Sequence, residues 1–323
     1  MRPYIQVMRR ALAVLTVALA AVVMPAQHAQ AQTCSVTMSN ASFGAVDLTQ
    51  NALYDTTASY TAACSGGSAG QTLRLCINLG AGSGGASGAN APRHLASAGN
   101  TLGYNLYLDA ARTSVWGAYT GGGDPKEIVL TLDGSGQQSA GGSMFATLFA
   151  NQSAAPTGTY TSSFAASASL SWDDTSAGDC TAIGATQATA FSFQASASYA
   201  AACTVSVGTM NFGTITQLQS AIETSASITT TCSAASPYTI GLGDGLHATG
   251  AMQRRMAFGA SRLTYELYQD SGRITPWGNA PGDRKAATGS GGTQVFTVYG
   301  RVPSQSEPVP GVYNDTVIVT VSY

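Results

Sequence analysis

The hydrophobic positions of this chain follow a period of two in several short segments. Residues 128–132 (IVLTL) and 315–323 (DTVIVTVSY) are rich in β-branched and aromatic side chains, which is typical of half-buried β-strands. Glycine, serine and asparagine separate such segments, and residues 80–91 (GAGSGGASGANA) have the composition of a long loop. No helix is predicted beyond the N-terminal segment, so we expect an all-β protein.

Residues 1–31 have the pattern of a secretory signal peptide. Three arginines precede an uncharged apolar run at residues 11–23, and Ala29-Gln30-Ala31 fits a cleavage site of small residues. A run of thirteen uncharged residues is too short to span a bilayer comfortably. We therefore expect an exported protein whose mature chain begins near Gln32.

The remainder of the chain contains two related halves. The motifs recur in the same order, which makes a chance match implausible. The matching pairs are Cys34…Phe43-Gly44 with Cys203…Phe212-Gly213, residues 102–109 (LGYNLYLD) with 263–270 (LTYELYQD), Arg112…Trp116-Gly117 with Arg273…Trp277-Gly278, residues 147–149 with 297–299, and residues 158–160 with 311–313. Halves of about 150 residues, built from short strands and turns, predict two tandem immunoglobulin-like β-sandwiches.

All six cysteines lie in the exported part, where an oxidising compartment favours disulfides. No CxxC or Cys/His spacing indicates zinc. Because the second cysteine of each half follows the first by 30 and 29 residues, the repeat predicts the pairs Cys34–Cys64 and Cys203–Cys232. This leaves Cys76 to pair with Cys180.

These motifs resemble the spore coat protein U domain. The resemblance rests on Cys-x-Val…Phe-Gly at the start of each half, Leu-x-Tyr-x-Leu-Tyr-x-Asp…Trp-Gly in the middle, and residues 310–323 (PGVYNDTVIVTVSY) at the end. It covers nearly all of the exported chain twice, although the first half lacks the Asp-Thr-Val run after Tyr160. The resemblance implies subunits of Csu-type, archaic chaperone–usher pili, which are incomplete immunoglobulin-like domains polymerised by donor-strand exchange. It also implies a periplasmic chaperone, an outer-membrane usher and an adjacent pilin as partners.

The segment between the halves alternates like a strand. It is apolar at every second position, which favours one buried face; these positions are Phe191, Phe193, Ala195, Ala197 and Tyr199. We expect residues 187–200 to complete the N-terminal domain (residues 32–202) within the same chain, the alternative being an ordinary linker strand. The second domain (residues 203–323) would then be the incomplete one.

The ends of the exported chain indicate which pilus subunit this is. Cleavage after Ala31 leaves only Gln32 and Thr33 before the first cysteine, too few to act as a donor strand for a neighbour. We therefore expect a tip subunit that accepts a donor strand and donates none. A chaperone, and then a pilin strand, would cover the apolar C-terminal edge, which consists of Val317, Val319, Val321 and Tyr323.

The composition is poor in chemically reactive groups. Charged residues make up 9% of the chain, the net charge is −2, and the only lysines are Lys126 and Lys285. A nucleic-acid partner is excluded by this charge, and no catalytic set, cofactor motif or phosphate loop can be assembled. Asp173, Asp174 and Asp179 could hold Ca²⁺, but they lack EF-hand spacing and are expected to be solvated loop residues. We predict neither an enzyme nor a metal site.

The candidate surface contacts lie in loops expected at the end of the first domain farthest from the second. The loop at 171–186, and those at 80–101 and 133–144, contain mostly Gly, Ala and Ser, which suits apolar or abiotic surfaces better than a charged ligand. Trp172, Ile183, Met144 and, more weakly, Tyr119 are the predicted contacts. Three functions then compete: a tip adhesin for abiotic or host surfaces and biofilm formation, a minor or shaft pilin, and a secreted carbohydrate-binding or hydrolytic β-sandwich. The tip adhesin is favoured.

Overall fold

β-Strands carry nearly all of the regular structure in residues 32–88, 91–174, 178–184 and 187–323, the residues that this computed structural model describes. The only helices in these ranges are a 3-10 turn, η1 (Leu48–Gln50), and the four-residue α2 (Cys180–Ile183). No helix of the described ranges is long and apolar enough to cross a membrane. The prediction of an all-β protein is confirmed. The predicted signal peptide, residues 1–31, lies outside the described residues.

Strands β1–β12 form the N-terminal domain. An eight-stranded sheet has the order β1-β3-β8-β6-β5-β9-β12-β2, and a four-stranded sheet, β11-β10-β4-β7, covers it. The strands are β1 (Thr33–Met38), β2 (Ala41–Val46), β3 (Tyr54–Ser65), β4 (Thr72–Leu79), β5 (Arg93–Ser97), β6 (Asn100–Tyr107), β7 (Lys126–Thr131), β8 (Gln138–Leu148), β9 (Gly158–Ser163), β10 (Ala168–Asp174), β11 (Thr189–Ala190) and β12 (Gln194–Tyr199).

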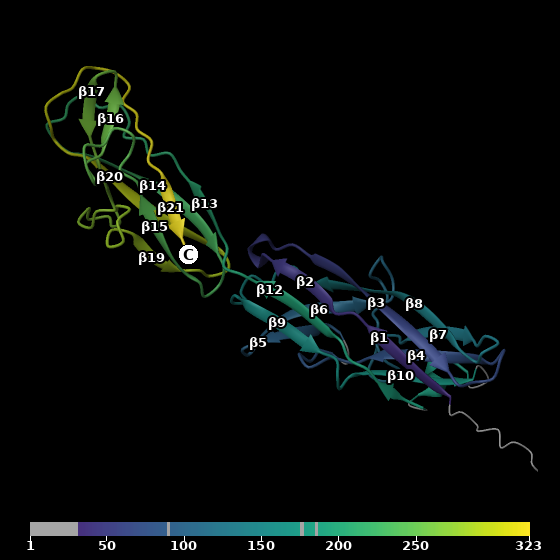
Figure 1. Ribbon diagram of the computed structural model, residues 1–323. Coiled ribbons are helices and arrows are strands. Elements are labelled where there is room, and N and C mark those ends of the chain that lie inside the picture. The colour runs from purple at the N-terminus through teal and green to yellow at the C-terminus, as the bar shows by residue number, and fades with distance from the viewer. Residues whose placement is uncertain (1–31, 89–90, 175–177, 185–186) are drawn as a thin grey trace, which may run out of the picture.

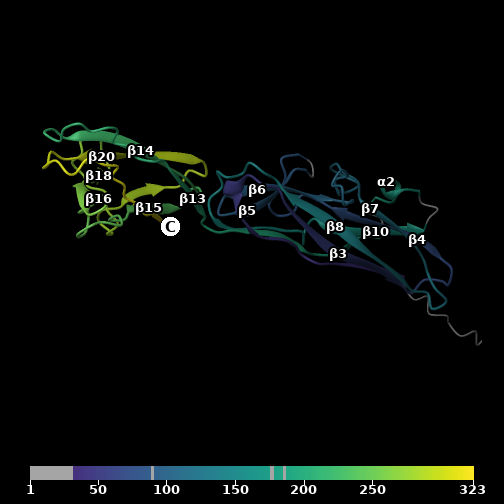
Figure 2. The ribbon, with the colours of Figure 1, turned by 90° about the horizontal axis from the view of Figure 1, so that it is seen from above.

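Strands β13–β21 form the C-terminal domain, which follows the first end to end (Figures 1 and 2). Its sheets have the orders β13-β14-β20-β18, β19-β15-β21 and β16-β17. The strands are β13 (Cys203–Val207), β14 (Ile222–Cys232), β15 (Pro237–Leu242), β16 (Arg255–Phe258), β17 (Ser261–Thr264), β18 (Glu266–Tyr268), β19 (Lys285–Thr288), β20 (Thr293–Val302) and β21 (Val319–Ser322).

Each domain has a separate apolar core, as expected from the alternation along its strands. In β3, for example, Ala58, Tyr60, Ala62 and Cys64 point inward and are buried, because successive side chains of a strand point to opposite faces. The core of each domain includes the recurring tryptophan of the repeat. Trp116 and Trp277 are 0% and 1% exposed, and each indole nitrogen donates to a backbone carbonyl of the opposite sheet at 2.9 Å.

Three disulfides join Cys34 to Cys64, Cys76 to Cys180 and Cys203 to Cys232. The first and third link the paired edge strands β1–β3 and β13–β14 at equivalent places, as the repeat predicts.

One part of the repeat alignment is wrong, however. Phe145 of β8 lies opposite Tyr107, and Tyr299 of β20 lies opposite Tyr268, so Tyr299 corresponds to Phe145 and not to Phe149. Alternating strands of similar composition look alike after an even shift, so their sequences alone do not fix the register.

The two domains touch through their backbones. Pro156 and Ala234 form a β-bridge, and Ser233 donates from its backbone to Ala202 O at 2.9 Å while its hydroxyl accepts from Ala202 N at 2.9 Å. Gly291 sits against Ser153 of the first domain, and a Cβ on it would lie 1.9 Å from the Ser153 carbonyl oxygen.

Replacing Gly291 with alanine is expected to disturb this junction. The backbone at Gly291 has φ +76°, which an L-residue adopts with strain, and the new methyl would clash with backbone that cannot yield easily. We expect a loss of about 1–3 kcal/mol, measured by denaturant unfolding of the whole chain. Gly292→Ala is the matched control, since a Cβ there meets only the Ser290 hydroxyl at 3.8 Å; equal effects of the two substitutions would contradict the prediction.

Candidate strand-accepting groove

In the N-terminal domain, strand β12 fills the space between β9 and β2. It runs antiparallel to β9 and parallel to β2, just before the chain crosses to the second domain (Figure 1). Its inward side chains are Ala195, Ala197 and Tyr199, none more than 2% exposed; the preceding Phe193 is 5% exposed, and Phe191 is partly buried against the same core. The segment proposed to complete the first domain thus lies within its main sheet.

The C-terminal domain has no strand at the corresponding place. The repeat matches residues 210–215 with β2 and residues 311–316 with β9. All of residues 203–323 are described, and within them no strand ladder joins these two segments. Asn314 forms a β-bridge with Ala257 on one side, as Thr161 of β9 does with Ala96. We call the gap on the other side, between residues 205–215 and 311–321, the strand groove.

Core-facing positions beside the strand groove are more exposed than their counterparts in the first domain. Val36 is 7% exposed, whereas the matching Val205 is 45% exposed. Phe43, Val46 and Tyr160 are at most 8% exposed, while their counterparts, Phe212, Ile215 and Tyr313, are only partly buried against the second core. The groove therefore opens onto apolar core that a strand covers in the first domain.

The C-terminal strand forms the far wall of this groove. Val317, Val319 and Val321 pack partly buried against the core, whereas Tyr323 is 61% exposed. Pairing of β21 with β15 leaves its other edge free of any ladder among the described residues. These are the four residues predicted as the edge that a chaperone or donor strand covers, and that role stays a prediction.

A carboxylate lies on the floor of the strand groove. Asp315 accepts hydrogen bonds from the Tyr265 hydroxyl at 2.7 Å and from Leu246 N at 2.9 Å. Gly245 permits this approach, since a Cβ there would lie 2.0 Å from the carboxylate. Burial, with a further contribution from the bond to Asp315, raises the pKa of Tyr265. Tyr265 therefore stays protonated and donates to the carboxylate at neutral pH.

Each domain contains a buried arginine that stabilises its core, and the sequence alone did not indicate either residue. Arg93 is 0% exposed and donates to the carbonyl oxygens of Leu79, Gly80 and Trp116 at 2.7–2.8 Å. Arg254, 1% exposed, makes the same three bonds in the second domain. Burial lowers the pKa of Arg93 to about 10, so the group remains charged at neutral pH. The available signal was an arginine eleven residues before the first tyrosine of both LxYxLY motifs.

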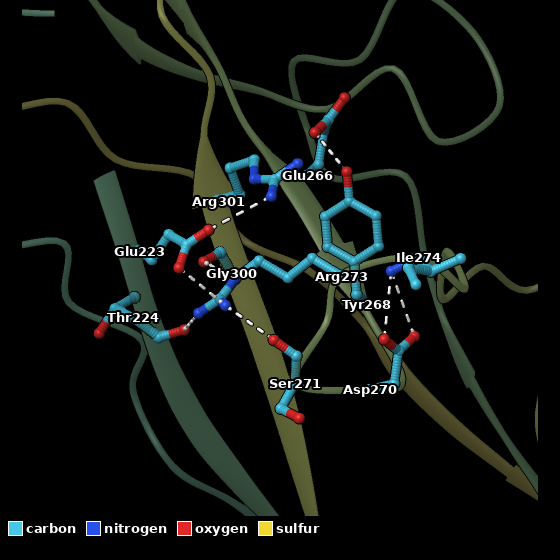
Figure 3. A network of polar contacts seen from close by, with 10 residues as sticks. All are labelled: Glu223, Thr224, Glu266, Tyr268, Asp270, Ser271, Arg273, Ile274, Gly300 and Arg301. Carbon is cyan, nitrogen blue, oxygen red and sulfur yellow. Dashed lines mark hydrogen bonds and ion pairs between the residues drawn. The ribbon is translucent and has the colours of Figure 1, made fainter. Parts of the chain in front are cut away.

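The charged network of the second domain is a repeated surface feature. Figure 3 shows Glu223 between Arg273 and Arg301, with N–O distances of 2.9 and 3.3 Å. Arg273 also stacks on Tyr299, as Arg112 stacks on Phe145 beside Asp55 in the first domain. Because both domains have this arrangement at the same place, we assign it a structural role.

Three of the four predicted surface contacts are buried, which corrects that prediction. Met144 is on the inward face of β8 and 0% exposed, Trp172 is on the inward face of β10 and 6% exposed, and Ile183 is 2% exposed in a small cluster with the Cys76–Cys180 disulfide. Their side chains fill the interior and cannot touch a surface. Tyr119 is partly exposed beside Gly184 and stays a candidate.

Only some of the loops predicted at the far end of the first domain lie at that end. The β3–β4 loop (66–71) and the β7–β8 loop (132–137) lie at the end away from the second domain (Figure 1). Residues 80–88 of the loop predicted at 80–101 instead pack beside the β9–β10 turn, where Ser83 N donates to Ser163 O. Asp179 caps α2 by accepting from the backbone at Thr181 and Ala182, a structural use of one proposed calcium ligand. Residues 175–177 of that acidic segment lie outside the described residues, and the described residues contain no His/Cys/Asp/Glu group suited to a metal ion.

The described chain consists of two consecutive β-sandwich domains. Its fold is similar to the CsuC–CsuE chaperone–tip adhesin pre-assembly complex from the archaic chaperone–usher Csu pili of Acinetobacter baumannii, with a TM-score of 0.51, 15% identity, and coverage of 90% of this chain and 100% of that one. The CupB6 tip adhesin of Pseudomonas aeruginosa aligns over 90% of this chain and 93% of its own, with a TM-score of 0.40 and 13% identity.

The family model of the Spore Coat Protein U domain matches residues 20–167 and again residues 189–320, and the chain belongs to this family. The resemblance found in the sequence is thereby confirmed. Over 95 residues the chain is also 39% identical to Protein U of Myxococcus xanthus, a match that covers 27% of this chain and 53% of that protein. The chain thus spans about half the length of this curated relative.

Proposed function

We propose that this chain is the tip adhesin of an archaic chaperone–usher pilus, exported by a signal peptide at residues 1–31. Its C-terminal domain joins the pilus by accepting a β-strand from the adjacent pilin. Its N-terminal domain, already completed by β12, contacts the surface to be colonised and so starts a biofilm. The observation that carries this proposal is the strand groove, which lies where β12 lies in the first domain.

The limits of the two family matches support a strand transfer between repeats. Each match begins 14 residues before the first cysteine of its half, at residue 20 for Cys34 and at residue 189 for Cys203. The segment before Cys203 pairs with β9 and β2 of the preceding domain. Within this one chain, a segment of the second repeat therefore completes the first, as donor-strand exchange would do between subunits.

The partners follow from the open groove. Before assembly, a periplasmic chaperone would cover this apolar edge, since an exposed edge strand over an open core invites aggregation. The usher and the adjacent pilin would then exchange that chaperone for the donor strand. The similar fold of a chaperone–tip subunit pre-assembly complex supports a chaperone as the first partner.

The surface contacted would be apolar or abiotic, or a host surface of low charge. The far-end loops at 66–71 (GGSAGQ) and 132–137 (LDGSGQ) contain a single charged residue, Asp133. Loops built from glycine, alanine and small polar residues are weakly hydrated and can approach a flat surface closely. They offer no positive charge with which to bind an anionic ligand.

A peptide copy of residues 190–200 (AFSFQASASYA) tests the proposal on the mature full-length chain. We expect the peptide to bind the strand groove and to raise the unfolding temperature of the C-terminal domain, followed through Trp277, the one tryptophan of that domain. In the control peptide the large side chains are moved by one position within the sequence, which places them on the outer face of the strand. A chain that is monomeric and stable, and whose unfolding neither peptide changes, would refute strand acceptance and favour a secreted binding protein.

A further inference from the structure

The structural correspondence between the domains gives the strand groove a position-by-position template. In the first domain Ala195 of β12 lies between Ser162 of β9 and Ala41 of β2. All three residues are 0% exposed, so their side chains meet in the core. Two small neighbours thus flank a small residue of the inserted strand.

Asp315 takes the place of Ser162 in the strand groove. Both residues lie four positions after the corresponding glycines, Gly158 and Gly311. Both also fill the space left by a positive-φ glycine: a Cβ on Gly82 would lie 2.4 Å from the Ser162 hydroxyl, and the matching Gly245 approaches Asp315 in the same way.

On the opposite wall of the groove, the residue is also larger than its counterpart in the first domain. Met210 stands where the first domain has Ala41, and its sulfur packs over Gly300, where a Cβ would lie 2.3 Å from it. The inserted residue would therefore lie between a methionine and a carboxylate, in place of an alanine and a serine. A bulky apolar side chain would have little room there and would press hydrocarbon against Asp315, which is costly for a charged group.

One end of the groove, in contrast, has room for a large apolar side chain. Val317 replaces Phe164, which stacks on Phe193 at 4.3 Å between ring centroids in the first domain, so more space is open opposite Val317. At the other end, Tyr199 of β12 lies opposite Gly158. The matching glycine of the groove, Gly311, is covered by the Phe258 ring, since a Cβ there would lie 2.3 Å from it, so this end gives no room for a second large side chain.

We propose that Asp315 makes the strand groove selective for a partner strand with a small residue, Gly, Ala or Ser, opposite this carboxylate. A large apolar residue of that strand lies two positions before the small one. The strand runs antiparallel to residues 311–317 and parallel to residues 210–215. This inference rests on the proposed function, because it concerns the strand that the groove would accept.

The test uses variants of the 190–200 peptide on the mature full-length chain. Leucine at the Ala195 position is expected to weaken binding at least tenfold, whereas serine there is expected to bind as well as alanine. Leucine at the Ser196 position adds the same side chain to the outer face and should change binding less than twofold. In the Asp315→Ser protein the penalty for leucine at position 195 should fall to less than threefold.

The outcomes separate this inference from the proposed function. If the parent peptide binds and the leucine-195 peptide binds equally well, the selectivity of Asp315 is refuted while strand acceptance stands. If no peptide binds, strand acceptance itself fails. If the free chain aggregates, the same strand sequences can be attached after Tyr323 through a flexible linker. The alanine and leucine versions are then compared by the unfolding midpoint of the C-terminal domain. In that format, equal midpoints for alanine and leucine would overturn the inference.

Discussion

Replacing Arg93 with leucine is expected to destabilise the N-terminal domain by about 3–5 kcal/mol, because three buried carbonyl oxygens lose their hydrogen-bond donors. The guanidinium is fully buried and supplies three hydrogen bonds to Leu79, Gly80 and Trp116. Without it, three carbonyl oxygens near the ends of buried segments lose their donors, and each buried unsatisfied group costs about 1–3 kcal/mol. Part of this loss is offset because no charge need be buried in the variant.

Arg93→Lys is expected to be destabilising as well, because lysine cannot take over the role of Arg93. Its ammonium is a compact point charge, whereas the planar guanidinium reaches three acceptors in fixed directions. Arg254→Leu is the companion variant and should lower the stability of the C-terminal domain only. Tryptophan fluorescence during denaturant unfolding distinguishes the domains, because Trp116 and Trp172 belong to the first and Trp277 to the second.

The surface residue Arg74 is the control for this prediction. It forms one ion pair with Glu127 at 2.7 Å, with both side chains partly exposed. Such pairs contribute about 0–1 kcal/mol, so Arg74→Leu should have a small effect. An unfolding midpoint of Arg93→Leu within the error of Arg74→Leu would contradict the structural role assigned to Arg93.

The buried arginines also show where the sequence is a poor guide. A charged side chain beside a glycine-rich loop suggests a solvated residue, and only the assembled core reveals the three carbonyls that Arg93 satisfies. Their common position before the LxYxLY motif was visible, but spacing alone does not indicate burial. By contrast, the all-β fold and the cysteine pairing were predictable, because alternation and repeat spacing are properties of the linear chain.

Two of the predicted surface contacts were wrong for a related physical reason. Trp172 and Met144 lie near loops in the sequence, but each is on a strand whose alternation turns it inward. Composition around them is rich in Ala, Gly and Ser, which hides the difference between the inner and outer faces. The strand groove was predictable in outline from the repeat. Asp315 was not, because a serine and an aspartate at equivalent positions look like ordinary polar variation until their contacts are seen.

Placing a charge on the inner face of β12 is expected to open the first domain in the same way that the second is open. Ala197 is 2% exposed and lies opposite Tyr160, so Ala197→Asp would bury a carboxylate among apolar groups. We expect a loss of about 4 kcal/mol or more, since a buried unpaired charge ranks among the most destabilising changes. Ser198→Asp is the matched control, because Ser198 is exposed on the outer face of the same strand.

This variant also tests whether β12 behaves as an inserted strand and not only as part of the core. If it does, Ala197→Asp should release β12, expose it to proteolysis around residues 191–199, and leave a first domain that the 190–200 peptide restores when added in trans. Limited proteolysis with and without the peptide measures both effects. If the variant unfolds and the peptide does not restore it, β12 is an ordinary core strand. Restoration would mean that the first domain takes up its last strand as a separable element, as the second domain is proposed to do with a strand from a neighbour.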